Sequence, residues 1–195
     1  MYMKTLTIEK IFQAGIVGGG GAGFPSWKKL NAKVEWLLIN GAECEPLLKS
    51  DQYIMRTFSE RLIEAACAVA QMTEAEHTVI ALKRTYKKEI QELSRAIEAA
   101  GASIEIFPLR PVYPAGDETI IVREVSGRTV PPGGIPLDVG CVVTNVSTLL
   151  ALSDSLEEKP SITRYVTVAG ATVQPGVFLV PVGTYVTDLL NWIGC

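Results

Sequence analysis

Short apolar segments alternate with helical segments through the first three quarters of the sequence, and this alternation constrains the fold more than any other feature. Apolar runs of strand length lie at residues 34–39, 77–82, 103–109 and 140–146. Helical patterns lie at residues 7–14, from 26 onward, and at 56–72, 87–100, 117–125 and 146–156. Continuous apolar strands separated by helices are typical of a parallel sheet that is covered on both faces. The sequence therefore predicts an α/β fold, a Rossmann-like parallel sheet with flanking helices.

A different pattern follows residues 157–160, Glu-Glu-Lys-Pro, which we interpret as a linker. Residues 164–169 and 176–181 form a hairpin-like pair, and a helix is expected at 187–193. This order is typical of the opening of a small β-grasp module. We therefore predict two domains, an α/β domain at residues 1–158 and an incomplete β-grasp segment at residues 163–195.

Charge and cysteine usage narrow the class of protein. The chain has 195 residues and a formal net charge of −3, which argues against a nucleic-acid partner. No apolar run approaches the ~18 residues of a membrane span, and residues 1–10 lack the apolar core of a signal peptide. The cysteines lack the paired spacing of a zinc or iron–sulfur site. We expect no metal site, a cytoplasmic location and four reduced thiols, at Cys44, Cys67, Cys141 and Cys195.

The first candidate binding motif is a glycine loop, Gly18 to Gly23, between two helical segments. Glycine lets a ligand approach the backbone closely, and successive free amides followed by a helix N-terminus favour an anion. Lys29 lies one turn into the following helix, within reach of a phosphate. The spacing matches neither common phosphate-binding fingerprint, so a flexible hinge or a tight turn between helices is the alternative.

The second candidate motif directly follows a predicted buried strand and runs from Asn40 to Pro46. Ligands of open α/β sheets bind beyond the carboxyl ends of the strands. Two alternating carboxylates, Glu43 and Glu45, lie at that edge with Asp51 nearby, where they can accept hydrogen bonds from ribose or ring N–H groups. A solvated loop is the alternative for either glutamate.

Two further polar motifs lie at the ends of predicted elements. Residues 113–118, Tyr-Pro-Ala-Gly-Asp-Glu, end a loop and open a helix. Residues 144–148, Thr-Asn-Val-Ser-Thr, end a strand and open another helix. Each motif suits a polar ligand, but each also suits simple capping of the helix that follows.

The four motifs in this order and spacing resemble those of the flavin-carrying subunit of respiratory complex I. The similarity is closer to related proteins, namely the C subunit of the Rnf ferredoxin–NAD complex, the cobalamin reductase of propanediol-utilisation compartments and the electron-transfer protein linked to proline reductase. Residues 39–46 and 127–136 resemble the Rnf branch in particular. The resemblance extends over about residues 10–195.

The resemblance implies a pocket for FMN above which NADH stacks, hydride transfer to the flavin, and release of single electrons. The protein would then be an NADH:acceptor oxidoreductase in which the flavin, and no protein acid or base, carries the chemistry. The implied cofactor-binding residues are Gly18, Gly20, Gly21, Ala22, Gly23, Lys29, Asn40, Tyr113, Gly116, Asp117, Thr144, Asn145 and Thr148. The implied NADH-binding residues are Phe24, Glu43, Glu45 and Glu118.

The sequence departs from this family by lacking a cysteine-rich ferredoxin-like segment. We therefore expect iron–sulfur clusters only in a missing segment or in a partner protein, in the cytoplasm or at the cytoplasmic face of a membrane complex. The chain is then the front part of a longer electron carrier. The alternatives are a non-catalytic scaffold or ligand-binding subunit of the same fold, and a corrinoid (cobalamin) reductase component.

Overall fold

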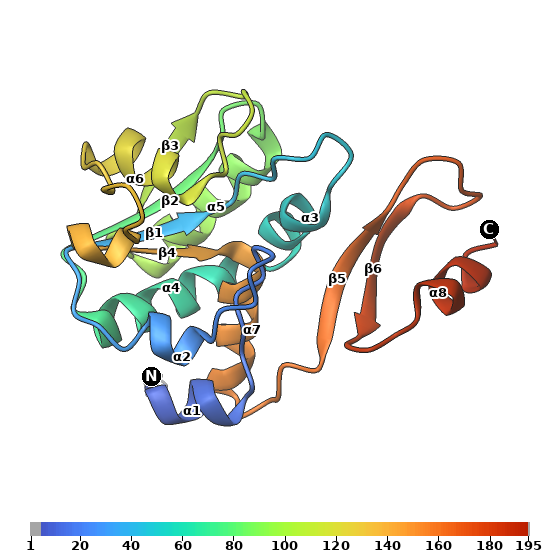
Figure 1. Ribbon diagram of the computed structural model, residues 1–195, viewed down its shortest axis with the longest axis horizontal. Coiled ribbons are helices and arrows are strands. Elements are labelled where there is room, and N and C mark those ends of the chain that lie inside the picture. The colour runs from blue at the N-terminus through green and yellow to red at the C-terminus, as the bar shows by residue number, and fades with distance from the viewer. Residues whose placement is uncertain (1–4, 195) are drawn as a thin grey trace.

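The computed structural model describes residues 5–194 and contains a four-stranded parallel sheet (Figure 1). The strand order is β3-β2-β1-β4, and all three pairings are parallel. The bounds of the strands are Trp36–Asn40 for β1, His77–Lys83 for β2, Glu105–Leu109 for β3 and Cys141–Asn145 for β4. The predicted α/β fold with a parallel sheet and flanking helices is confirmed.

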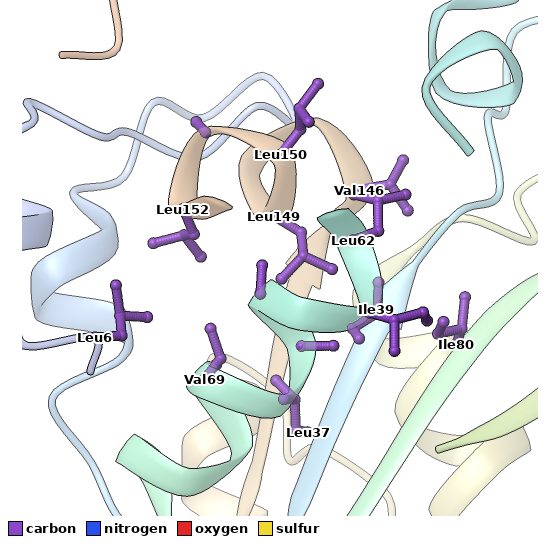
Figure 2. Packing of buried hydrophobic residues seen from close by; sticks show 14 of the residues in the cluster. Leu6, Leu37, Ile39, Leu62, Val69, Ile80, Val146, Leu149, Leu150 and Leu152 are labelled. Atoms are coloured by element: carbon purple, nitrogen blue, oxygen red, sulfur yellow. The ribbon is translucent and has the colours of Figure 1, made fainter. Parts of the chain in front are cut away.

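Helices cover both faces of this sheet because successive strand residues point to opposite sides. Leu37 and Ile39 of β1 pack into the larger core, with helices α4, α5 and α7 (Figure 2). Leu38, between them, packs into a second cluster with Ile121 of helix α6. The helices are α1 (Ile8–Gln13), α2 (Ser26–Lys29), α4 (Ser59–Thr73), α5 (Lys87–Ala100), α6 (Glu118–Ser126) and α7 (Val146–Leu156), with a short 3-10 helix η1 at Pro136–Val139.

The structure differs from the sequence prediction between β1 and β2. A single helix was expected at residues 56–72, but α3 (Ser50–Thr57) precedes α4, and the chain bends at Phe58. The side chain of Lys49, the residue before α3, makes no hydrogen bond that caps this helix. Instead the Oε1 atom of Glu43 accepts a hydrogen bond of 2.9 Å from the backbone amide of Asp51, in the first turn. A helix start stabilised from eight residues away has no local signature.

The C-terminal part forms a separate two-stranded antiparallel sheet, β5 (Thr163–Val168) and β6 (Gly176–Pro181), followed by α8 (Val186–Trp192). It extends away from the parallel sheet and meets it through α3 (Figure 1). The ring centroids of Tyr165 and Tyr53 lie 5.3 Å apart, and the Thr167 hydroxyl accepts a hydrogen bond from the Lys49 amide. The division at residues 158 and 163 and the β-grasp identity stay predictions. Among the described residues no helix is long and apolar enough to cross a bilayer.

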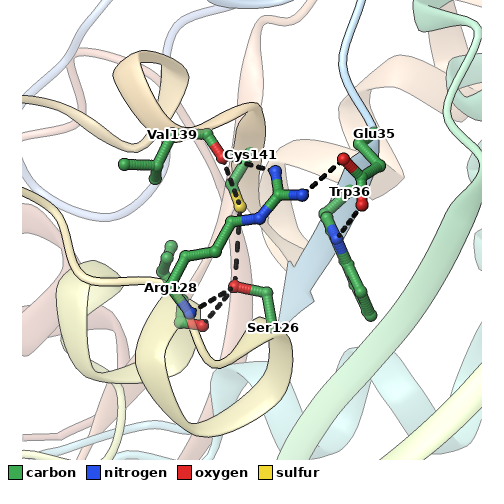
Figure 3. A network of polar contacts seen from close by, with 7 residues as sticks. Glu35, Trp36, Ser126, Arg128, Val139 and Cys141 are labelled. Carbon is green, nitrogen blue, oxygen red and sulfur yellow. Dashed lines mark hydrogen bonds and ion pairs between the residues drawn. The ribbon is translucent and has the colours of Figure 1, made fainter.

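The amino ends of the strands are joined by a polar network around Arg128 (Figure 3). Its guanidinium pairs with Glu35 and donates a hydrogen bond of 2.7 Å to the Val139 carbonyl. The Trp36 indole donates to the same Glu35 carboxylate at 3.0 Å. Hydrogen bonding to Arg128 lowers the pKa of Glu35. This network links the segments before β1, after α6 and before β4.

Candidate cofactor site at the switch point of the sheet

The topology places a crevice between the carboxyl ends of β1 and β4. From β1 the chain builds β2 and β3 on one side, and it returns to place β4 on the other side. Open α/β sheets bind ligands at such a switch point. Asn40 and Asn145 are register partners and are the last residues of the two strands.

A cleft occupies this position, and it brings together residues from all four predicted motifs. Its lining is Gly18, Gly19, Gly20, Ser26, Lys29, Leu30, Asn40, Gly116, Glu118, Thr144, Asn145 and Thr148. Gly19, Ser26 and Leu30 were not among the predicted site residues, although Gly19 belongs to the glycine run and Ser26 follows it. A larger cavity, of about 320 Å³, lies between α1 and the end of α7, and no residue of the parallel sheet lines it.

The glycine loop crosses the first turn of α7. The Gly19 amide donates a hydrogen bond of 2.8 Å to the Thr148 hydroxyl, and the Gly18 amide closes the loop onto the Phe24 carbonyl at 2.8 Å. A Cβ on Gly19 would lie 2.2 Å from the Ser147 hydroxyl, so a larger residue would require this hydroxyl to move. Within the described chain, the amides of residues 20–23 donate no hydrogen bond.

The two strand-end asparagines hold backbone in place around the cleft. The Asn40 amide group donates to the Gly116 carbonyl and accepts from the Ala42 amide, both at 2.9 Å. A Cβ on Gly116 would lie 2.2 Å from the Ala42 carbonyl oxygen, which explains the glycine. The Asn145 side chain accepts from the Ser147 amide at 2.8 Å and so caps α7.

The charged groups of the cleft form one ion pair. Lys29 is the only cation in the lining, and its ammonium lies 2.7 Å from the Glu118 carboxylate. The preceding residue, Asp117, caps α6 by accepting hydrogen bonds from the amides of Thr119 and Ile120. Hydrogen bonds to the Asp117 carboxylate, the strongest of them from the Thr119 side chain, lower the pKa of Asp117. Asp117 lies outside the lining, and its capping role matches the alternative that the sequence left open.

The remaining predicted residues lie outside the lining of the cleft. Phe24 and Tyr113 are exposed, with 51% and 77% of their surface accessible. Glu45 is also exposed, whereas Glu43 is buried, and its Oε2 atom has no hydrogen-bond partner among the described residues. The other three are the exposed loop residues Gly21, Ala22 and Gly23.

The polar groups present fit FMN. The hydroxyls of Ser26 and Thr144 make no hydrogen bond within residues 5–194, and they line the cleft together with Lys29 and with Gly20, whose amide is also unpaired there. Donors with one cation suit phosphate and ribityl oxygens. The cleft encloses about 90 Å³, less than the roughly 300–1,000 Å³ usual for small-molecule sites. The tip of the glycine loop, at residues 20–24, is exposed at the edge of this cleft.

An all-parallel sheet with a polar cleft at its switch point defines an α/β domain of the nucleotide-binding class. Residues 11–154 match the Nuo51 FMN-binding domain, and the chain belongs to this family. The family predicted from the four motifs is therefore confirmed, and this membership supports a role in flavin-based electron transfer.

The chain is also similar over nearly its whole length to individual proteins of known activity. The chain is 42% identical to the cobalamin reductase PduS of Citrobacter freundii over 187 residues, which cover 95% of this chain and 41% of that protein. It is 36% identical to the C subunit of the proton-translocating ferredoxin:NAD(+) oxidoreductase complex of Clostridium ljungdahlii over 201 residues, 98% of this chain and 44% of that relative. The chain thus spans about two fifths of these relatives.

A solved structure shares the fold. The crystal structure of an NAD+-reducing [NiFe]-hydrogenase in its H2-reduced state superposes with a TM-score of 0.83 at 24% identity. The superposition covers 95% of this chain and 38% of the hydrogenase chain. At this identity the similarity concerns the fold, and it includes both the parallel sheet and the C-terminal hairpin because nearly the whole chain is covered.

Proposed function

We propose that this chain binds FMN and NAD(H) as part of an NADH:acceptor oxidoreductase. The observation that carries the proposal is the cleft between Asn40 and Asn145, where Gly20, whose amide is unpaired among the described residues, and Lys29 line a switch point. When bound, FMN supplies a group that accepts a hydride and gives up electrons singly. We place the protein in the cytoplasm or at the cytoplasmic face of a membrane complex.

The chain's own residues bind and orient the cofactor. The amides of residues 20–23 and the Lys29 ammonium hold phosphate and ribityl oxygens, with the Thr144 and Thr148 hydroxyls adding contacts from the strand end. Asn40 fixes the Gly116 carbonyl at the opposite wall. These groups are preorganised by the sheet, so little ordering is needed at that wall on binding.

The NADH side of the site lies at the mouth of the cleft. Phe24 offers an exposed ring to the nicotinamide nucleotide, and Tyr113 lines the opening. We assign the positioning of NADH to Glu45 and Glu118, and to Glu43 acting from behind the cleft wall. No protein acid or base is required, because the carboxylates position the nucleotide and do not transfer protons in the hydride step.

Two relatives of this chain suggest different electron acceptors. An iron–sulfur protein or subunit is the first candidate, since one relative belongs to a ferredoxin:NAD(+) oxidoreductase complex. A corrinoid is the second candidate, because the relative at 42% identity is a cobalamin reductase. In both cases residues 1–158 provide the flavin domain, and residues 163–195 contribute a β-grasp segment.

Two glycine variants test the cofactor assignment. Gly21 and Gly170 both have left-handed φ angles, +104° and +99°, and a Cβ on either would meet no atom within 4 Å. Gly21→Ala and Gly170→Ala therefore impose similar backbone strain, but only the first lies in the glycine loop. In a titration followed by flavin fluorescence, we expect FMN affinity to fall about tenfold or more for Gly21→Ala, with Gly170→Ala unchanged.

A wild-type protein that leaves FMN fluorescence unaltered at millimolar protein would refute the proposal. Equal FMN affinities of the two variants would refute the assignment of the loop. Anaerobic addition of NADH to the FMN-loaded protein tests the nucleotide separately, because bleaching of the flavin absorbance reports the hydride step. Transfer from the reduced protein to a ferredoxin or to a corrinoid then distinguishes the two acceptors.

A further inference from the structure

Two buried carboxylates lie directly behind the cleft wall. Asp51 and Glu43 are 8% and 7% exposed. The Asp51 amide donates to Oε1 of Glu43, and Oε2 of Glu43 is buried without a partner among the described residues. Burial of two carboxylates side by side is costly, since both cannot be charged without compensation.

Asn145 connects this pair to the cleft. Its Oδ1 accepts from the Ser147 amide, which fixes the orientation of the side chain, so its Nδ2 must face Asp51. Nδ2 donates to Oδ2 of Asp51 at 2.9 Å. Asn145 also caps α7, whose Thr148 accepts from Gly19 of the glycine loop. One side chain therefore separates the Asp51 carboxyl from the cofactor cleft.

No cation neutralises the pair among the described residues. The nearest guanidinium on α3, that of Arg56, is held by Glu89 of α5 at 2.6 Å. The other titratable neighbours are Cys44 and Tyr86, and burial together with the charges of Glu43, Asp51 and Glu89 raises the pKa of Tyr86 to about 12. Burial, with the charge of Glu43 adding to it, raises the pKa of Asp51 to about 7, although the hydrogen bond from Asn145 acts in the opposite direction.

We propose that Asp51 and Glu43 form a charge-compensating pair that exchanges one proton with water when the negative charge in the cofactor cleft changes. An anionic ligand in the cleft favours the protonated pair, and loss of that proton weakens the anionic ligand. The inference rests on the proposed function for the identity of the ligand, FMN. Asp51 is a positioning residue, because it acts through Asn145 and touches no ligand.

The test compares FMN affinity between pH 6.5 and 8.5 in four proteins. Wild type is expected to lose about tenfold more affinity over this range than Asp51→Asn, which keeps the acceptor for Asn145 but cannot ionise. Asp188→Asn removes the carboxylate of an exposed aspartate in the first turn of α8, which is not part of the cleft lining, so its profile should follow wild type. Asp51→Ala removes the acceptor and should bind more weakly at every pH. The titration of FMN's own phosphate is common to all four and cancels in the comparison.

Identical pH profiles for wild type and Asp51→Asn would overturn the inference while leaving FMN binding intact. If no protein binds FMN at any pH, the proposed function fails, and NMR still decides the inference. In that case the Asp51 carboxyl carbon should titrate near neutral pH, and the Gly19 amide should titrate with it in wild type but not in Asp51→Asn. Titration of Asp51 in the ordinary range of an aspartate would refute the inference.

Discussion

At the amino end of the parallel sheet, Arg128 satisfies the Glu35 carboxylate and the Val139 carbonyl at once (Figure 3). At the carboxyl end of the same sheet, within residues 5–194, loop amides lack partners, and Asp51 lies buried beside Glu43 without a cation. Both ends are built from segments that flank β1 and β4. The amino end therefore stabilises the sheet, whereas the carboxyl end carries a buried pair of carboxylates that costs stability.

The two ends of the sheet differ in whether their charged groups contribute to the stability of the fold. Buried carboxylates that do not improve the folded state are typical of functional sites. The contrast predicts opposite signs for substitutions at the two ends. Removing a charge at the carboxyl end should stabilise the protein, and removing one at the amino end should destabilise it.

The largest expected effect is a gain in stability from Asp51→Asn. Burial raises the pKa of Asp51 from its usual 3.8 to about 7. The unfolded chain therefore releases this proton between about pH 4 and 7 while the folded protein keeps it, so the free energy of unfolding falls over that range. The variant avoids this loss and should gain up to about 4 kcal/mol at pH 8 and less at pH 5, measured by urea unfolding.

Asp188→Asn is the control for this prediction, because Asp188 is an exposed aspartate in the first turn of α8. Its effect should be small and should not differ between the two pH values. If the stability difference between wild type and Asp51→Asn were the same at pH 5 and pH 8, Asp51 would titrate normally. The carboxyl end of the sheet would then not carry a destabilising carboxylate.

The second effect concerns the cation of the cleft. Lys29→Met should weaken FMN about tenfold or more, since a hydrogen bond to a charged group contributes about 1.5–3 kcal/mol. Riboflavin, which lacks the phosphate, should bind wild type and variant equally if Lys29 holds the phosphate. Lys33→Met removes an exposed lysine paired with Glu74 and should change neither affinity. If Lys29→Met weakened FMN and riboflavin binding equally, Lys29 would contact the ribityl chain and not the phosphate.

The sheet could be predicted from sequence because its signals are local. Each strand contains a short apolar run, and α5 begins and ends at residues 87 and 100, as the periodicity and the stop at Gly101 predict. The helix α3 could not be predicted, because its first turn is stabilised by Glu43 across a loop. A polar contact between residues far apart in sequence leaves no periodic pattern.

The cleft was predictable in outline but not in detail. Strand-end motifs meet at one edge in any parallel sheet, which is why Asn40, Gly116 and Asn145 come together. What each amide does depends on neighbours that only the fold supplies. Asn40 binds the Gly116 carbonyl and Asn145 binds Asp51, so both hold the wall of the cleft. The ion pair of Lys29 with Glu118 joins residues 89 apart, and no spacing rule reveals it.

The smallest expected effect lies at the amino end. Arg128→Met should lower the free energy of unfolding, because it leaves Glu35 and the Val139 carbonyl without their partner. The loss should be smaller than the gain at Asp51, since both charged side chains are about one third exposed and are screened by water. Arg128 lowers the pKa of Glu35 from its usual 4.5, so this contribution is present above that pH and is lost as the pH falls.

Urea unfolding at pH 7 and pH 3.5 checks this prediction, with Arg95→Met as the control because Arg95 forms an exposed pair with Glu92. The wild-type advantage should shrink at pH 3.5 and in 1 M salt, while FMN affinity stays unchanged in both variants. A change in FMN affinity for Arg128→Met would contradict the separation of the two ends, because it would mean that the amino-end network also controls the spacing of β1 and β4 at the cleft.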